Sequence, residues 1–196
     1  LAGRCDEAGT AFLEAALDAE PEAKRRFEQQ AGEAWLVCGR VHDGLHVLLP
    51  LLAREGLPYP NDMPGIVRAL LYVIARARLR TMSKPKLGAR VDRALLARAE
   101  IAFGIGKGLL SVAPAQGTIL ALESLVLGLR ARDERAIARG LGFAGCGFAP
   151  FTHAVGPRYL GWAGEIAERL DDDHLRTTLL IAKSVRATIS TRCGVR

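Results

Sequence analysis

Aromatic residues make up only 6% of this 196-residue chain, and no apolar run in it is long enough to cross a bilayer. A transmembrane helix needs about 20 mostly apolar residues, and the run at 70–75 falls far short. Residues that favour strands are sparse, and no alternating apolar–polar segment exceeds a few positions. We therefore predict an all-α chain with no β-sheet and no membrane contact. The start also lacks a secretory signal pattern, so we expect a cytoplasmic location.

Catalytic signatures are missing as well. Protein-kinase chemistry needs a His-Arg-Asp loop and an Asp-Phe-Gly metal site, and neither tripeptide occurs. The segment nearest to a phosphate-binding loop is 104–108, but Ile101 stands where that loop needs glycine and Gly108 where it needs Ser or Thr. We expect this chain to be no enzyme and to bind no cofactor.

Cysteine and histidine are too few and too scattered to form a metal site. The four cysteines show no C-x-x-C spacing and are interpreted as small apolar side chains in a reducing compartment: Cys5, Cys38, Cys146 and Cys193. His42 and His46 are four residues apart and can share one helix face, but no third ligand is evident. We interpret them as polar residues at a hairpin turn.

The sequence does contain a repeat with an offset of 36 residues. Its first copy consists of Gly3, Ala8, Phe12, Leu13, Ala15 and Ala16, and its second of Gly39, Gly44, Leu48, Leu49, Leu51 and Leu52. A fixed period of this size indicates stacked helical hairpins, because one hairpin cannot bury its apolar face alone. The alternative is a helical bundle with a chance echo.

The repeat is similar to the tetratricopeptide pattern. Gly32 and Trp35 have that pattern's glycine–aromatic spacing, and we expect the Trp35 ring to fill the space beside Gly32. Trp35 and Phe12 are predicted to lie buried between helical layers. The pair Gly3-Arg4 is predicted to be an inter-helix turn, as Gly39-Arg40 is one period later.

We expect about nine helices in antiparallel hairpins, stacked as a tetratricopeptide-like α-solenoid. A kink is predicted at Pro50, and Asp133 is predicted to cap a helix. The expected helices are 6–19, 22–38, 43–54, 64–80, 90–110, 114–130, 134–148, 157–170 and a last one that follows 171–173 and runs to 189. The whole chain, 1–196, is interpreted as one helical-repeat region from a larger protein, with hairpin copies at 1–20 and 21–56 and diverged pairs at 63–110, 114–148 and 157–190.

Positive charge is concentrated in one segment of this chain of net charge +6. Eight cations there face Asp92 alone: Arg76, Arg78, Arg80, Lys84, Lys86, Arg90, Arg93 and Arg98. Arg side chains bind carboxylates and phosphates, so we predict that this basic segment binds an acidic or phosphorylated protein. Nucleic acid is a weaker alternative, because the segment has no aromatic residues on which bases could stack. A merely solvated face is the third.

Several different short segments, distributed along nearly the whole chain, form one further pattern. They include Gly39-Arg40, 57–60, 75–80, 108–112, 127–131 and 136–141. This pattern resembles the helical-repeat region that follows the catalytic domain in a family of bacterial serine/threonine protein kinases. The resemblance implies a tetratricopeptide-like scaffold in a signalling protein, whose partner is another protein or the parent's own kinase domain. A regulatory module of an ATPase-type transcription activator and a nucleic-acid-binding helical domain are the alternatives.

Overall fold

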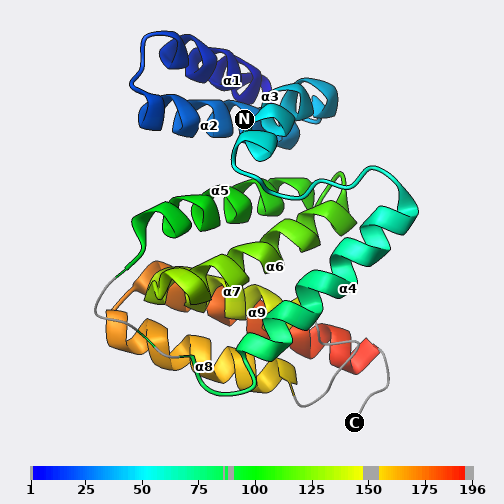
Figure 1. Ribbon diagram of the computed structural model, residues 1–196, viewed down its shortest axis with the longest axis vertical. Coiled ribbons are helices and arrows are strands. Elements are labelled where there is room, and N and C mark those ends of the chain that lie inside the picture. The colour runs from blue at the N-terminus through cyan, green and yellow to red at the C-terminus, as the bar shows by residue number, and fades with distance from the viewer. Residues whose placement is uncertain (1, 86, 88–90, 148–154, 193–196) are drawn as a thin grey trace. The chain divides into compact units, whose positions relative to one another are not determined.

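The computed structural model describes residues 2–85, 87, 91–147 and 155–192. These residues form nine α-helices and no strand, which confirms the predicted all-α class (Figure 1). The helices are α1 (Ala2–Leu17), α2 (Pro21–Val37), α3 (Val41–Arg54), α4 (Met63–Arg80), α5 (Arg93–Leu109), α6 (Pro114–Ala131), α7 (Glu134–Gly147), α8 (Val155–Leu170) and α9 (Asp173–Arg192). None of the described helices is long and apolar enough to span a membrane.

The chain divides into two compact units. The first consists of Leu1–Val73 and Glu100–Ala121, and the second of Ile74–Ala99 and Leu122–Arg196. Each unit has its own set of buried apolar side chains. Leu48, Leu51 and Leu52 are buried in the first unit, and Leu125, Ile137 and Tyr159 are buried in the second.

In the first unit, close helix packing depends on glycine. A β-carbon at Gly9 of α1 would lie 2.4 Å from the Trp35 indole nitrogen, and one at Gly32 would lie 2.4 Å from Leu48 of α3. Trp35 is 8% exposed, as predicted. The expectation that Gly32 makes room for Trp35 is wrong, because Gly9 takes that role. The prediction pairs two residues of the same helix, whereas the contact of the Trp35 ring is with Gly9 and joins α1 to α2.

Two further expectations about the first copy of the repeat are corrected. Gly3-Arg4 is no turn, because α1 already begins at Ala2. The turn one period later is real: Gly39 has φ +80°, a conformation that side-chain-bearing residues rarely adopt. Phe12 is only half-buried, and its ring stacks on Phe27 at 6.4 Å between centroids.

The glycines of α5 lie inside one continuous helix, in the part of it that belongs to the first unit. A β-carbon at Gly106 would lie 3.0 Å from the Gly117 carbonyl oxygen, so Gly106 lets α6 approach closely. A β-carbon at Gly104 would instead meet the side chain of Gln29 of α2. Because 104–108 is helical, it forms no phosphate-binding loop. Pro50 likewise lies within helix α3, which runs on to Arg54; the predicted kink stays a prediction.

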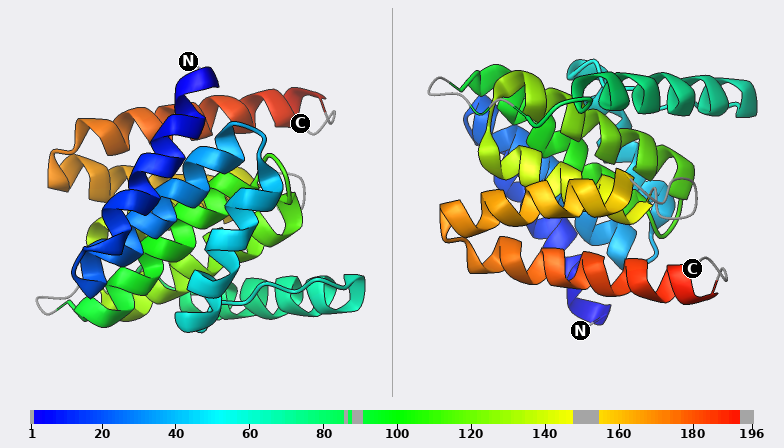
Figure 2. Two further views of the ribbon diagram at one scale, coloured as in Figure 1. Left: turned by 90° about the horizontal axis from the view of Figure 1, so that it is seen from above. Right: turned by 90° about the horizontal axis from the view of Figure 1, so that it is seen from below.

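In the second unit, aspartates fix where helices begin. Asp133 accepts a hydrogen bond from the Ala136 amide at 2.8 Å, which confirms it as the cap of α7. Asp172 accepts one from the Leu175 amide at 3.0 Å at the start of α9. Both helices then pack against each other, and α7 also packs against α8. α8 and α9 form an antiparallel hairpin that runs side by side along one edge of this unit (Figure 2).

Candidate protein-interaction surface

The predicted basic segment lies in the second unit, and part of its charge is neutralised within the fold. The Arg76 guanidinium donates to both carboxylate oxygens of Glu123 on α6, at 2.9 and 3.0 Å. The two side chains are 25% and 12% exposed. Their removal from water makes this a structural ion pair, because either charge alone would be costly there. Arg76 is therefore not available to a partner.

The other cations of the basic segment differ in their surroundings. Lys84 pairs with Glu165 of α8 at the surface. Arg78 and Arg98 are half-buried, whereas Arg80 and Arg93 are exposed. Lys86 and Arg90 lie outside the described residues. The expected excess of eight cations over one carboxylate is thus reduced, because the sequence could not show that Glu123 and Glu165 fold back onto this segment.

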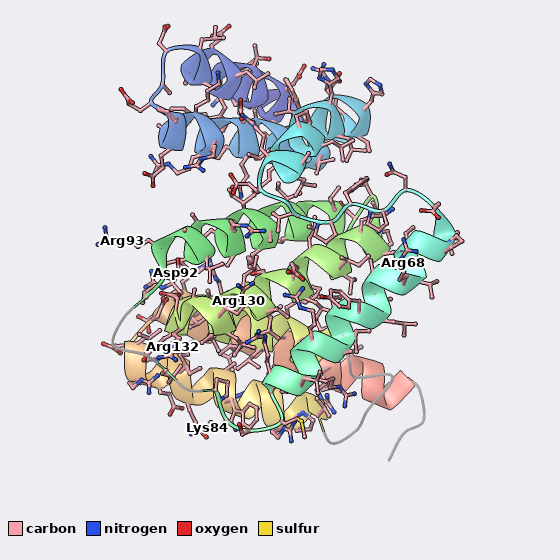
Figure 3. The ribbon with its side chains drawn as sticks, in the orientation of Figure 1. Arg68, Lys84, Asp92, Arg93, Arg130 and Arg132 are labelled. Carbon is pink, nitrogen blue, oxygen red and sulfur yellow. The ribbon has the colours of Figure 1, made fainter. Side chains whose placement is uncertain are left out.

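Two exposed cations from another part of the chain flank the residue that Asp92 contacts. The Asp92 amide donates to the Ala131 carbonyl oxygen at 3.2 Å, which brings the start of α5 to the end of α6. Arg130 and Arg132 flank Ala131, and Figure 3 labels both together with Asp92 and Arg93. Asp92 itself accepts from two amides of α5. Sequence reasoning missed Arg130 and Arg132 because some forty residues separate them from Arg93.

A surface groove, not foreseen from the sequence, runs between α8 and α9. One hollow of about 410 Å³ is lined by Pro157, Leu160, Gly161, Lys183, Arg186 and Ala187. A second, of about 230 Å³, is lined by Gly164, Ala167, Glu168, Arg176, Leu179, Leu180 and Lys183. Lys183 borders both, so the two hollows are parts of one feature, which we call the α8–α9 groove.

The walls of the groove have the same spacing on both helices. On α8 they are Pro157, Gly161, Gly164 and Glu168, and on α9 they are Arg176, Leu180, Lys183 and Ala187. Both sets are separated by four, three and four residues, which places each set on one helix face. This is the spacing with which helices line a seam for another helix. Buried Leu160, Ala167 and Leu179 form the apolar floor.

Two of these wall residues are glycines in mid-helix with open space around them. A β-carbon built on Gly161 or Gly164 has no heavy atom within 4 Å beyond its own helix. Glycine inside a helix costs roughly 0.5–1 kcal/mol relative to alanine, and no contact among the described residues offsets that cost at Gly161 and Gly164. On α9, Leu180 lines the second hollow and is 62% exposed to water. Ile181 and Val185 are also exposed, at 61% and 43%, but they lie on the other side of α9.

The groove carries an excess of positive charge. Arg176 is balanced by ion pairs to Asp171 and Asp173 at 2.8 Å. Lys183 is exposed at the centre, and Arg186 donates to the Gly145 carbonyl oxygen. Glu168 is the one carboxylate among the lining residues. At the start of α9, the Leu175 amide holds the pKa of Asp172 below its ordinary value, with a further contribution from Arg135.

The histidines of α3 and the cysteines of the first unit are not among the residues that line the groove. His42 and His46 are both exposed on α3, and the described residues hold no group of three side chains suited to a metal ion. Cys5 and Cys38 are neighbours in space, because their thiols share a hydrogen bond beside the Asp6–Arg40 ion pair. Burial and this contact raise the pKa of Cys38. Cys193 lies outside the described residues.

No family model, no curated protein and no solved structure matches the chain.

Proposed function

We propose that this chain is a non-catalytic scaffold that binds another protein through the α8–α9 groove. The observation that carries the proposal is the pair Gly161 and Gly164, two mid-helix glycines that face open space in a groove bordered by the exposed side chain of Leu180. An apolar groove of this size left to water is unfavourable, and covering it with a protein surface removes that cost. The excess of cations indicates a partner with an acidic surface.

The wider context rests on the resemblance to kinase-associated helical repeats. In that setting the scaffold holds an acidic or phosphorylated protein, or the parent's own kinase domain, in a bacterial signalling protein of the cytoplasm. A module of an ATPase-type transcription activator is the alternative. The sequence of the surrounding gene distinguishes them, because a kinase core on one side supports the first and a P-loop domain supports the second.

A position-specific photocrosslinking experiment tests the binding role. Benzoylphenylalanine replaces Leu180, which lines the groove and is 62% exposed, or, as a control, Val37, which is 74% exposed in the first unit. Both chains are irradiated in the cells that produce this protein. We expect a protein adduct from position 180 that is missing from position 37 and is lost when Gly164→Leu fills the groove. Identical adducts from the two positions, no adduct at all, or adducts to nucleic acid would contradict the proposal.

A further inference from the structure

Resting on the proposed function, the geometry points to a specific occupant of the α8–α9 groove: an acidic amphipathic helix of the partner protein. The occupant is a helix because both walls repeat at four, three and four residues, the spacing at which two helices receive the side chains of a third. An extended peptide would find no free backbone edge here, since the described walls are helical and their amides bond within the helices.

The two hollows set the spacing of the occupant's apolar side chains. The first hollow lies at Pro157 and Gly161, and the second lies seven residues further along α8, at Gly164 and Glu168. Seven residues correspond to about 10.5 Å along a helix axis. A helix parallel or antiparallel to α8 therefore places large apolar residues in the hollows when they are seven positions apart. Gly161 in the first hollow and Gly164 in the second let the backbone of the occupant approach α8 closely.

Charge selects the polar residues of the occupant. Lys183 stands between the hollows and is exposed, so a carboxylate between the two apolar positions of the occupant meets it. Glu168, the one carboxylate among the lining residues, lies at the end of the groove away from Pro157. The occupant therefore carries its carboxylates centrally and toward the Pro157 end, and this asymmetry fixes its direction in the groove.

A selection from a library of displayed peptides tests the inference on the full chain. The probes are 20-residue helix-forming peptides with randomised positions on one face. We expect the enriched peptides to carry apolar residues seven apart with Asp or Glu between them. Reversal of the central charge by Lys183→Glu should shift the selected residue between them to Lys or Arg, because specificity that depends on charge follows the sign of the groove residue. Lys107→Glu, on α5 in the first unit, is the matched control and should leave the selection unchanged.

Several outcomes would overturn the inference. They are an enrichment with no preference at the central position, an acidic preference that survives Lys183→Glu, and an enrichment that survives Gly164→Leu. A wild-type dimer that Gly164→Leu converts to a monomer would assign the groove to a second copy of this chain instead. If photocrosslinking at position 180 still captures a protein while the selection shows no acidic preference, the helix inference fails and the proposed function stands. If both experiments fail, the groove is no binding site.

Discussion

Two neighbouring helices of the second unit use glycine in opposite ways. On α7, a β-carbon at Gly140 would lie 2.8 Å from the Leu125 β-carbon and 2.9 Å from its α-carbon, and one at Gly145 would lie 3.1 Å from the Gly156 carbonyl oxygen. On α8, β-carbons at Gly161 and Gly164 would meet nothing. The glycines of α7 are explained by helices inside this chain, whereas no described side chain or helix packs on those two of α8. The difference is why we propose that a partner helix binds there.

The largest effect that we expect comes from a packed glycine and its neighbour in the first unit. Trp35 fills the space above Gly9, so Trp35→Ala should lower the free energy of unfolding by about 3–5 kcal/mol, the usual cost of removing a large buried ring. Denaturant melts measure the change. Val37→Ala, two residues away and exposed, should stay within about 0.5 kcal/mol. A loss below about 1 kcal/mol for Trp35→Ala would show that this ring is not part of the core.

The next effect tests the α7 side of the comparison. Gly140→Ala inserts a methyl group against backbone atoms of Leu125, which cannot move without shifting α6. We expect a destabilisation of about 1–3 kcal/mol, typical of overpacking, despite the better helix propensity of alanine. The same melts measure it. A variant as stable as the wild type would mean that α6 and α7 are further apart than described.

The α8 side predicts the opposite sign. Gly161→Ala and Gly164→Ala should each stabilise the free chain by roughly 0.5–1 kcal/mol, because alanine restricts the unfolded chain and meets no neighbour in the folded one. The pair of single variants and the double variant provide an internal check, since their effects should add. Destabilisation by either single substitution would show that a neighbour within this chain already occupies the groove.

The sequence predicts helices from local signals, whereas the surroundings of a side chain are not local. Asp133 is such a local signal, and the structure confirms it as a helix cap. The partners of a glycine are not local. Gly3 and Gly39 share a place in the repeat, yet one lies within α1 and the other in a turn at φ +80°. For the same reason the sequence does not show that Glu123, on another helix, pairs with Arg76 of the basic segment.

A smaller effect concerns the start of α9, which positions one wall of the groove. The Leu175 amide and Arg135 lower the pKa of Asp172 in the folded chain. Its ionised form therefore stabilises the fold above the ordinary aspartate pKa of about 3.9, and this contribution is lost as pH falls through the lowered folded value. Asp172→Asn should differ from the wild type in thermal melts at pH 6 and much less near pH 2. An equal difference at both pH values would assign the effect to the amide hydrogen bond rather than to charge.

The most direct test of the α8–α9 groove is the equilibrium binding of a selected acidic peptide, measured by fluorescence anisotropy. We predict that Gly164→Leu weakens binding by at least about tenfold, or 1.4 kcal/mol, because the new side chain occupies the space that the peptide needs. Ala97→Leu adds the same side chain at an exposed position of α5 and should bind the peptide like the wild type. Undiminished affinity in Gly164→Leu, with its fold intact, would contradict the account.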